Sequence, residues 1–323
     1  MKPGTRSARQ TAWTVAKWLA LAGLLALAAR TGHLAAVGLA FRDADWRWIG
    51  AALGLGGAML VIRAAKWRWL LMRVRAETSR LTASRSLLCG MALGLVTPGR
   101  VGELGRAAFL PPGMRTAAAG LFLIDRATDV AALGAAACFG TLAVAPPDWR
   151  WPLAAAGCSA LLLVFTLPVG LPALLAARYL PAWLRERLYP AAAALKRLRH
   201  RDIAANLIAA VLLTGLDVVS LYVLARAFEP VGFAVIAFAF PWILLSNLIP
   251  ITPAGIGVRE GTAAVILHAH GVGVPTAVNA SLLLFAINTL APALVGLAWM
   301  TTAGQAPATV ENPTTQSNVP PAR

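Results

Sequence analysis

Charged residues are scarce in this sequence of 323 residues: they make up 13% of it, whereas hydrophobic residues make up 59%. Soluble globular domains carry about 25% charged residues, so the composition argues against a soluble protein and is typical of a helical membrane protein. Acidic residues are the scarcest, with 13 Asp and Glu against 29 Lys and Arg. Because the basic residues cluster between apolar runs, we expect them to face anionic lipid headgroups, and we expect no nucleic-acid partner.

Cysteine is also rare, and recognisable catalytic or nucleotide-binding motifs are absent. Cys89, Cys138 and Cys158 are scattered within apolar runs, which fits neither a disulfide framework nor a metal-ligand spacing. His268 and His270 would point in different directions on a helix, which argues against a zinc site. There is no P-loop, dinucleotide glycine fingerprint or nucleophile elbow. We therefore expect no metal, no cofactor, no catalytic residue and no ATP-driven step.

The apolar runs are numerous enough for a multi-pass protein. About 17 residues or more are needed to span a bilayer, and candidate membrane segments are expected at 12–29, 49–62, 117–145, 152–176, 203–228, 231–248, 256–270 and 275–300. A cleavable signal peptide is the alternative for the first. Residues 146–151 read as a short external turn. Residues 183–195 suggest an amphipathic helix on the membrane surface.

Two connections between these runs are strongly basic. Residues 63–85 and 178–201 each contain seven basic residues and one acidic residue. Cytoplasmic loops of membrane proteins carry an excess of Lys and Arg, so both loops and the N-terminus are predicted to be cytoplasmic, in a multi-pass protein of the inner membrane.

One apolar run is interrupted by proline and glycine and then followed by charge. After the run 87–96 come Pro98 and Gly99, and next Arg100, Glu103 and Arg106. Proline removes a backbone donor and glycine loosens the chain, so the segment should break here and resume as a helix. Arg100, Glu103 and Arg106 recur every three residues and should share roughly one helix face. Intramembrane charge is rare and usually functional, so this face is the first candidate site.

A second interruption of the same kind lies close to half the chain length further on. Pro253, Gly255 and Gly257 follow an apolar run and precede Arg259 and Glu260. Paired interrupted segments in corresponding positions of two halves point to the binding site of a transporter. The alternative is that both are merely kinked helices that cross the membrane completely.

The expected fold is therefore an all-α, polytopic transmembrane helical bundle, with a two-fold internal repeat and two broken, re-entrant helix hairpins. The transmembrane domain should cover residues 1–302, with repeat halves at about 12–145 and 152–302. The remaining residues, 303–323, are rich in Pro, Thr, Gln and Asn and are predicted to form a disordered tail.

Three segments together resemble a known family. They are KWRWLL, the break TPGRVGELGRAAFL followed by LIDRATD, and LIPITPAGIGVREG. The chain resembles the lysylphosphatidylglycerol synthase transmembrane-region family, also described as flippase-like, from about Trp13 to Met300. Asp125 stands where we associate a Glu with the family pattern. The resemblance implies two broken-helix hairpins and a role in handling polar-headed lipids. Since only a short tail follows Met300, we expect the aminoacyl-transferase activity of the full-length relatives to be absent.

Arginine suits a lipid headgroup site because its guanidinium binds phosphate bidentately and stays charged in a dry site. We expect Arg100 and Arg259 to bind the headgroup phosphate, with Arg106 as a third candidate. Glu103 and Glu260 would hold these arginines or bind a cationic headgroup. The alternative is that each pair is an internal salt bridge that locks its hairpin. Three asparagines should form interhelical hydrogen bonds, the first of them at the site: Asn247, Asn279 and Asn288.

A further charged group, Asp125, Arg126 and Asp129, can gather on one side of a helix and is a candidate for gating or proton coupling. The alternative, which we favour for this group, is that Arg126 and Asp129 neutralise each other. Asp217 has no partner nearby in the sequence, which makes it the better candidate for a proton site.

The sequence favours a lipid flippase or lipid transporter acting on anionic phospholipid, its aminoacylated form or a polyprenyl-phosphate-linked substrate. The main alternative is an intramembrane enzyme, or an accessory subunit that presents a lipid-linked substrate to a transferase partner. A purely structural scaffold would leave the duplicated charged breaks unexplained.

Overall fold

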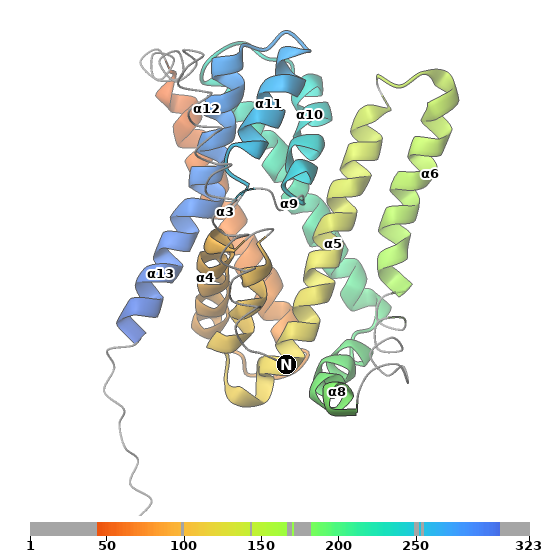
Figure 1. Cartoon of the computed structure of the whole chain (residues 1–323), viewed down its shortest axis with the longest axis vertical. Helices are drawn as coiled ribbons and strands as arrows, with labels where there is room; N and C mark the ends of the chain where they lie inside the picture. Colours follow the sequence, from red (N-terminus) through yellow and green to blue (C-terminus); the bar gives the residue numbers. More distant parts are fainter. Residues whose placement is uncertain are drawn as a thin grey trace, which may run out of the picture.

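The structure is a computed structural model, and it describes residues 44–97, 100–142, 144–166, 170, 182–248, 252 and 255–303. All regular elements in these residues are helices, which confirms the predicted all-α class (Figure 1). Four helical segments of the described residues are long and apolar enough to cross a membrane: Trp46–Leu71, Pro147–Thr166, His200–Arg226 and Val274–Met300. The chain is therefore a multi-pass membrane protein. The expected first span and the tail after Ala303 lie outside the described residues.

The first described helix, α3 (Trp46–Leu71), begins at Asp45, whose Oδ1 accepts a hydrogen bond from the backbone N of Arg47 at 3.0 Å. It continues well past the predicted end at Ile62. Residues 63–71 were expected in a basic loop, and they instead form the last turns of this helix, with Lys66 and Trp67 buried. The connection between α3 and the next helix is therefore only residues 72–79.

The first interrupted segment consists of α4 (Arg80–Val96) and the 3₁₀ helix η1 (Val101–Phe109). Ser79 caps α4, because its Oγ accepts a hydrogen bond from the backbone N of Thr82 at 3.0 Å. The helix predicted after the break exists, but it is a 3₁₀ helix and not an α-helix. A short 3₁₀ turn, η2 (Pro112–Met114), then leads into the next helix.

Helix α5 (Arg115–Thr141) is as long as the longest candidate spans and carries Asp125, Arg126 and Asp129 near its middle. Helix α6 (Pro147–Leu163) ends in the 3₁₀ turn η3 (Val164–Thr166). The turn expected at 146–151 is wrong: these residues open α6, with Pro147 at the first helical position, where a missing N–H costs no hydrogen bond.

Helix α8 (Ala182–Lys196) confirms a helix where the amphipathic segment was predicted. Ala191, Ala194 and Leu195 of this helix are buried. A Cβ at Gly120 of α5 would lie 2.8 Å from the carbonyl oxygen of Ala191, so the two helices approach closely at this glycine. The position of α8 relative to a membrane surface stays a prediction.

The second half of the chain continues with α9 (His200–Arg226), α10 (Phe233–Leu245) and the 3₁₀ turn η4 (Ser246–Leu248). After the second interruption comes α11 (Val258–His268). The last long segment is continuous but mixed in type. It consists of α12 (Val274–Phe285), a π-helical turn η5 (Ala286–Leu290) and α13 (Ala291–Ala303).

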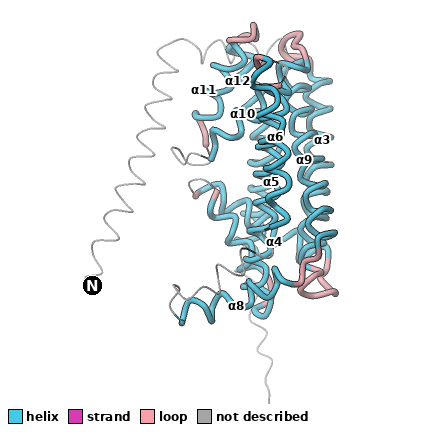
Figure 2. The backbone as a smooth tube through the Cα atoms, turned by 90° about the vertical axis from the view of Figure 1, so that its right-hand side faces the viewer, coloured by secondary structure: helices cyan, strands magenta, loops and turns pink. Residues whose placement is uncertain are grey.

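Each interrupted segment forms a hairpin: α4 and η1 make the first hairpin, and α10 and α11 make the second. The two hairpins occupy opposite halves of the bundle. In Figure 1, α4 lies in the lower half, whereas α10 and α11 lie in the upper half. The perpendicular view in Figure 2 shows the same vertical order, with the two hairpins approaching each other near mid-height. This arrangement fits two hairpins that enter from opposite sides. Their re-entrant character and the internal repeat stay predictions.

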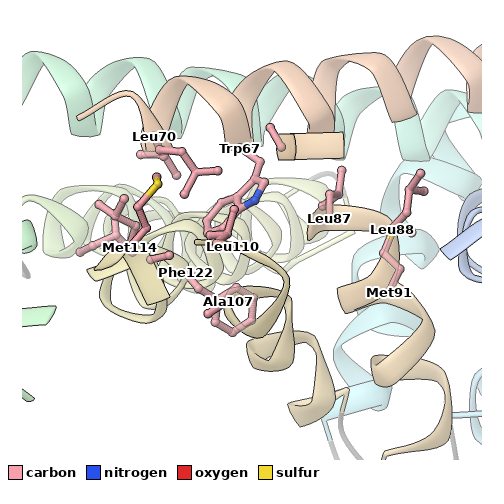
Figure 3. Close-up of a cluster of buried hydrophobic side chains, with 14 of the residues drawn as sticks. Trp67, Leu70, Leu87, Leu88, Met91, Ala107, Leu110, Met114 and Phe122 are labelled. Carbon is pink, nitrogen blue, oxygen red and sulfur yellow. The ribbon is translucent and has the colours of Figure 1, made fainter. Parts of the chain in front are cut away.

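Two main hydrophobic clusters support these hairpins. The lower cluster joins α3, α4, η1 and α5, and Figure 3 shows Trp67 close to the side chains of the first hairpin. The upper cluster joins α9, α10, α11 and α12 around buried residues such as Phe240 and Leu224. Each hairpin is thus packed mainly within its own half.

Candidate functional site

A cavity of about 200 Å³ lies between the two halves. Charged side chains from both hairpins and from the helices beside them line it: Arg63, Lys66, Arg100, Glu103, Arg106, Asp125, Arg126, Asp129, Asp217 and Arg259. Uncharged polar side chains complete the polar part of the wall: Asn247, Asn288, Thr214 and Thr289. Such a concentration of charge inside a membrane protein usually marks a functional site.

The end of the first hairpin is shaped by Thr97. Its Oγ1 accepts a hydrogen bond from the backbone N of Gly102 at 2.7 Å and donates one to the carbonyl oxygen of Leu93 at 3.1 Å. Arg100 has a φ of 57°, in the left-handed region that non-glycine residues rarely adopt. The chain therefore turns sharply before η1. The predicted break residues Pro98 and Gly99 lie outside the described residues.

Arg100 directly precedes η1, and the 3₁₀ type of η1 places Glu103 and Arg106 in one row, because residues three apart eclipse each other in this helix. Glu103 lies between the two cations: its Oε1 is 2.6 Å from Arg100 Nε and its Oε2 is 3.2 Å from Arg106 Nη2. A Cβ at Gly94 of α4 would lie 2.7 Å from the Glu103 Cγ, so the absence of a side chain at Gly94 leaves room for Glu103.

This row continues into α5 and α3. Arg106 Nη1 is 3.3 Å from Asp125 Oδ2. Lys66 then connects the two acids of α5, with its Nζ 2.9 Å from Asp125 Oδ1 and 2.6 Å from Asp129 Oδ1. One chain of ion pairs thus runs from Arg100 to Asp129. The favoured pairing of Arg126 with Asp129 is not among the ion pairs that the structure describes, and the cation in contact with Asp129 is Lys66 from another helix.

The Arg106 guanidinium contacts aromatic rings as well as carboxylates. Its guanidinium carbon lies 4.9 Å from the ring centre of Trp67 and 4.5 Å from that of Phe122. Cation–π contacts of this kind add to the ion pairs, and the side chain is almost fully buried. Arg106 therefore anchors η1 to the lower hydrophobic cluster.

The end of the second hairpin requires glycine. Gly255 has a φ of 72° and Gly257 a φ of 86°, values that residues with a Cβ rarely adopt. Thr252 Oγ1 donates a hydrogen bond to the carbonyl oxygen of Ile256 at 2.8 Å, and the Gly257 N–H donates to Glu260 Oε2 at 2.6 Å. As at the first break, a threonine side chain binds the turning backbone. The predicted break residue Pro253 lies outside the described residues.

Arg259 mirrors Arg106 in its surroundings. It forms an ion pair with Glu260, its Nε donates to Ser281 Oγ at 3.0 Å, and its guanidinium lies 4.8 Å from the ring centre of Phe285. Arg259 lines the cavity, whereas Glu260 is not among the described cavity-lining residues. The ion pairs of the predicted alternative are therefore present for Arg100, Arg106 and Arg259, and their role in locking the hairpins stays a prediction.

Asp217 of α9 has a partner on another helix. Its Oδ2 is 3.1 Å from Arg63 Nη2, and its Oδ1 accepts a hydrogen bond from Asn288 Nδ2 at 2.9 Å. Arg63 Nη1 also donates to the carbonyl oxygen of Asn288 at 3.2 Å. Asn288 lies in the π-helical turn η5, a helix type that is frequent at functional sites. The argument for Asp217 as a proton site rested on its lacking a partner, and Arg63 removes that argument.

Sequence reasoning missed Arg63 and Lys66 as site residues. They were assigned to a basic loop because five more basic residues follow before residue 86. Their spacing of three, directly after an apolar run, was the available signal, since it places both on one face if the helix continues. Within the described residues, no group of three or more His, Cys, Asp and Glu side chains is arranged to hold a metal ion.

Arg126 differs from the other cations of the cavity. Each of the others has a carboxylate oxygen within 4.0 Å, whereas the ion pairs of the described residues include none for Arg126. Its side chain is half-buried and lines the cavity. The cavity thus has a cation available for an added anion.

Comparison with known families agrees with a membrane protein. Residues 14–296 match the family described as the lysylphosphatidylglycerol synthase TM region. No curated protein matches the chain. The match covers most of the sequence, including both interruptions and every charged residue of the cavity, so this chain belongs to the family of the lysylphosphatidylglycerol synthase transmembrane region.

Proposed function

We propose that this protein binds a phosphate-headed membrane lipid in the charged cavity and translocates it across the inner membrane. The observation that carries the proposal is a cavity between two interrupted helix segments, lined by cations from both halves of a multi-pass bundle. Substrate sites of transporters lie near the bilayer midplane at discontinuous helices. A lipid headgroup needs such a polar site, while its tails stay in the surrounding hydrocarbon.

The arginines have different roles in this proposal. Arg106 and Arg259 are nearly buried, bound to carboxylates and stacked on aromatic rings, so they hold the two hairpins in shape. Arg100 and Arg63 are the more exposed, with 30% and 25% of their side chains accessible. Among the predicted headgroup ligands, Arg100 is therefore the residue best placed to contact the phosphate, and Arg63 joins it.

The proposed orientation follows from the basic connections. Two basic segments adjoin elements in the lower half of Figure 1. The first consists of residues 72–79 and the start of α4, and the second runs from α8 to the start of α9. The excess of Lys and Arg in these segments supports a cytoplasmic location of this end. In this orientation the first hairpin enters from the cytoplasmic side and the second from the opposite side.

The test is lipid movement in proteoliposomes. Headgroup-labelled phosphatidylglycerol is followed with a quencher restricted to the outer leaflet, for wild type, Arg100→Ala and Arg259→Ala. Arg226→Ala is the matched control, since Arg226 lies at the end of α9, 5.6 Å from the ring centre of Trp48, and does not line the cavity. We expect wild type and the control to move lipid and Arg100→Ala to fail while remaining folded.

The result that would overturn the proposal is a wild-type protein that moves none of several anionic lipids, with or without a proton gradient. If such a protein still bound lipid, the role of presenting a lipid-linked substrate to a transferase would replace translocation. A carboxylate variant that binds lipid but loses a chemical turnover would support the enzymatic alternative.

A further inference from the structure

The described residues around the cavity carry one more positive than negative charge when every group is ionised. The cations are Arg63, Lys66, Arg100, Arg106, Arg126 and Arg259. The carboxylates that line the cavity or bind one of these cations are Glu103, Asp125, Asp129, Asp217 and Glu260. An uncompensated charge in a low-dielectric interior is costly, so a ligand that cancels this excess is favoured over one that enlarges it.

Resting on the translocation proposal, we propose that the ligand is a phosphodiester lipid with a single net negative charge, and that Arg126 is the cation that its phosphate neutralises. Arg126 is the cation of this group for which the described ion pairs include no carboxylate oxygen within 4.0 Å, and the carboxylates of the cavity are in contact with other cations. Asp125 binds Lys66 and Arg106, and Asp129 binds Lys66. The planar guanidinium of Arg126 suits two phosphate oxygens.

The same ion pairs argue against other headgroup charges. A phosphomonoester carries a charge of about −1.5 to −2 at neutral pH and would leave the cavity with a negative excess. A zwitterionic headgroup adds an ammonium, which needs a carboxylate of its own. Each carboxylate that the structure describes in the cavity already has a cation within 3.3 Å, so none is left for the ammonium. A zwitterion also has no net charge, so it would leave the positive excess of the cavity unchanged.

The experiment measures binding of three lipids with identical short acyl chains to the purified full chain in detergent, by calorimetry. The probes are phosphatidylglycerol, with one negative charge; phosphatidylethanolamine, with the same diester plus an ammonium; and phosphatidic acid, a monoester. We expect wild type to bind phosphatidylglycerol about tenfold or more tightly than either of the others, since a charge-assisted hydrogen bond contributes that much.

Three variants separate charge from shape. Arg126→Gln should weaken phosphatidylglycerol binding by about tenfold or more and remove the preference over phosphatidylethanolamine. Arg126→Lys keeps the charge and should keep the preference. Asp129→Asn raises the excess by one charge and should shift the preference toward phosphatidic acid. Arg226→Gln is the control away from the cavity, and thermal unfolding checks that each variant is folded.

The outcomes distinguish this inference from the proposed function. If wild type moves lipid but binds the three probes equally, or if Arg126→Gln keeps the preference, the charge argument is overturned and translocation stands. If wild type neither binds nor moves any of the three lipids, both the charge inference and the translocation proposal are overturned. Should Arg126→Gln fail to fold, the shift expected for Asp129→Asn decides the matter alone, and an unchanged preference there overturns the inference.

Discussion

Replacing Lys66 with methionine tests the ion-pair chain most directly. Lys66 lies in the middle of that chain, its side chain is 5% exposed, and it contacts both Asp125 and Asp129. In the Lys66→Met variant Asp125 keeps Arg106 at 3.3 Å, whereas Asp129 loses the cation that the structure describes for it. Breaking a buried ion pair by removing one partner costs about 3–5 kcal/mol. Because 39% of the Asp129 side chain is exposed, water reduces this penalty, and we expect a loss of about 3 kcal/mol.

The free energy of unfolding can be measured by titrating SDS into mixed micelles and following helix content. The double variant Lys66→Met/Asp129→Asn removes the orphaned carboxylate and should be about 1–2 kcal/mol more stable than Lys66→Met alone. Asp129→Asn by itself leaves Lys66 bound to Asp125 and should cost the least. The reasoning is refuted if Lys66→Met lies within about 0.5 kcal/mol of wild type, or if the second substitution destabilises it further.

Two further predictions concern packing between helices. Gly296 of α13 faces the backbone of Leu88, so Gly296→Ala should lower the free energy of unfolding by about 1–3 kcal/mol in the same titration. The control is Gly54→Ala, whose added Cβ meets no atom within 4 Å and which should be neutral or stabilising. Equal effects of the two substitutions would contradict this account. Trp242→Phe removes the hydrogen bond of 3.2 Å from Trp242 Nε1 to Thr141 Oγ1 and should cost about 0.5–1.5 kcal/mol, with no added cost when Thr141→Val is already present.

The place of the candidate site could be predicted from the sequence because proline, glycine and charged residues visibly interrupt the apolar runs. Two interruptions, each followed by Arg and Glu, indicated where helices break, and the structure brings Arg100, Glu103, Arg106 and Arg259 from both of them to one cavity. Asn247, next to the second break, lines the same cavity. None of these expectations needed knowledge of how the helices pack.

The partners of the charges could not be predicted, because they come from helices distant in the sequence. Lys66 looks like part of a loop until α3 is seen to continue for several turns beyond the apolar run. Arg63 reaches Asp217 on α9, which lies about half the chain away. Such pairs depend on which helix faces pack together, and a periodicity within one helix carries no information about that choice.

The winding of η1 has a mechanical consequence. In a 3₁₀ helix Glu103 and Arg106 point the same way, but in an α-helix three residues advance by about 300°, so the two side chains would point about 60° apart. The same nine residues would also shorten by about 4.5 Å, since the rise per residue falls from 2.0 to 1.5 Å. A single change of winding would thus turn Glu103 relative to Arg106 and change the distance between Arg100, which precedes η1, and Arg106, while η1 remained helical. The winding of this short segment therefore determines how far the cation at its start lies from the cation near its end.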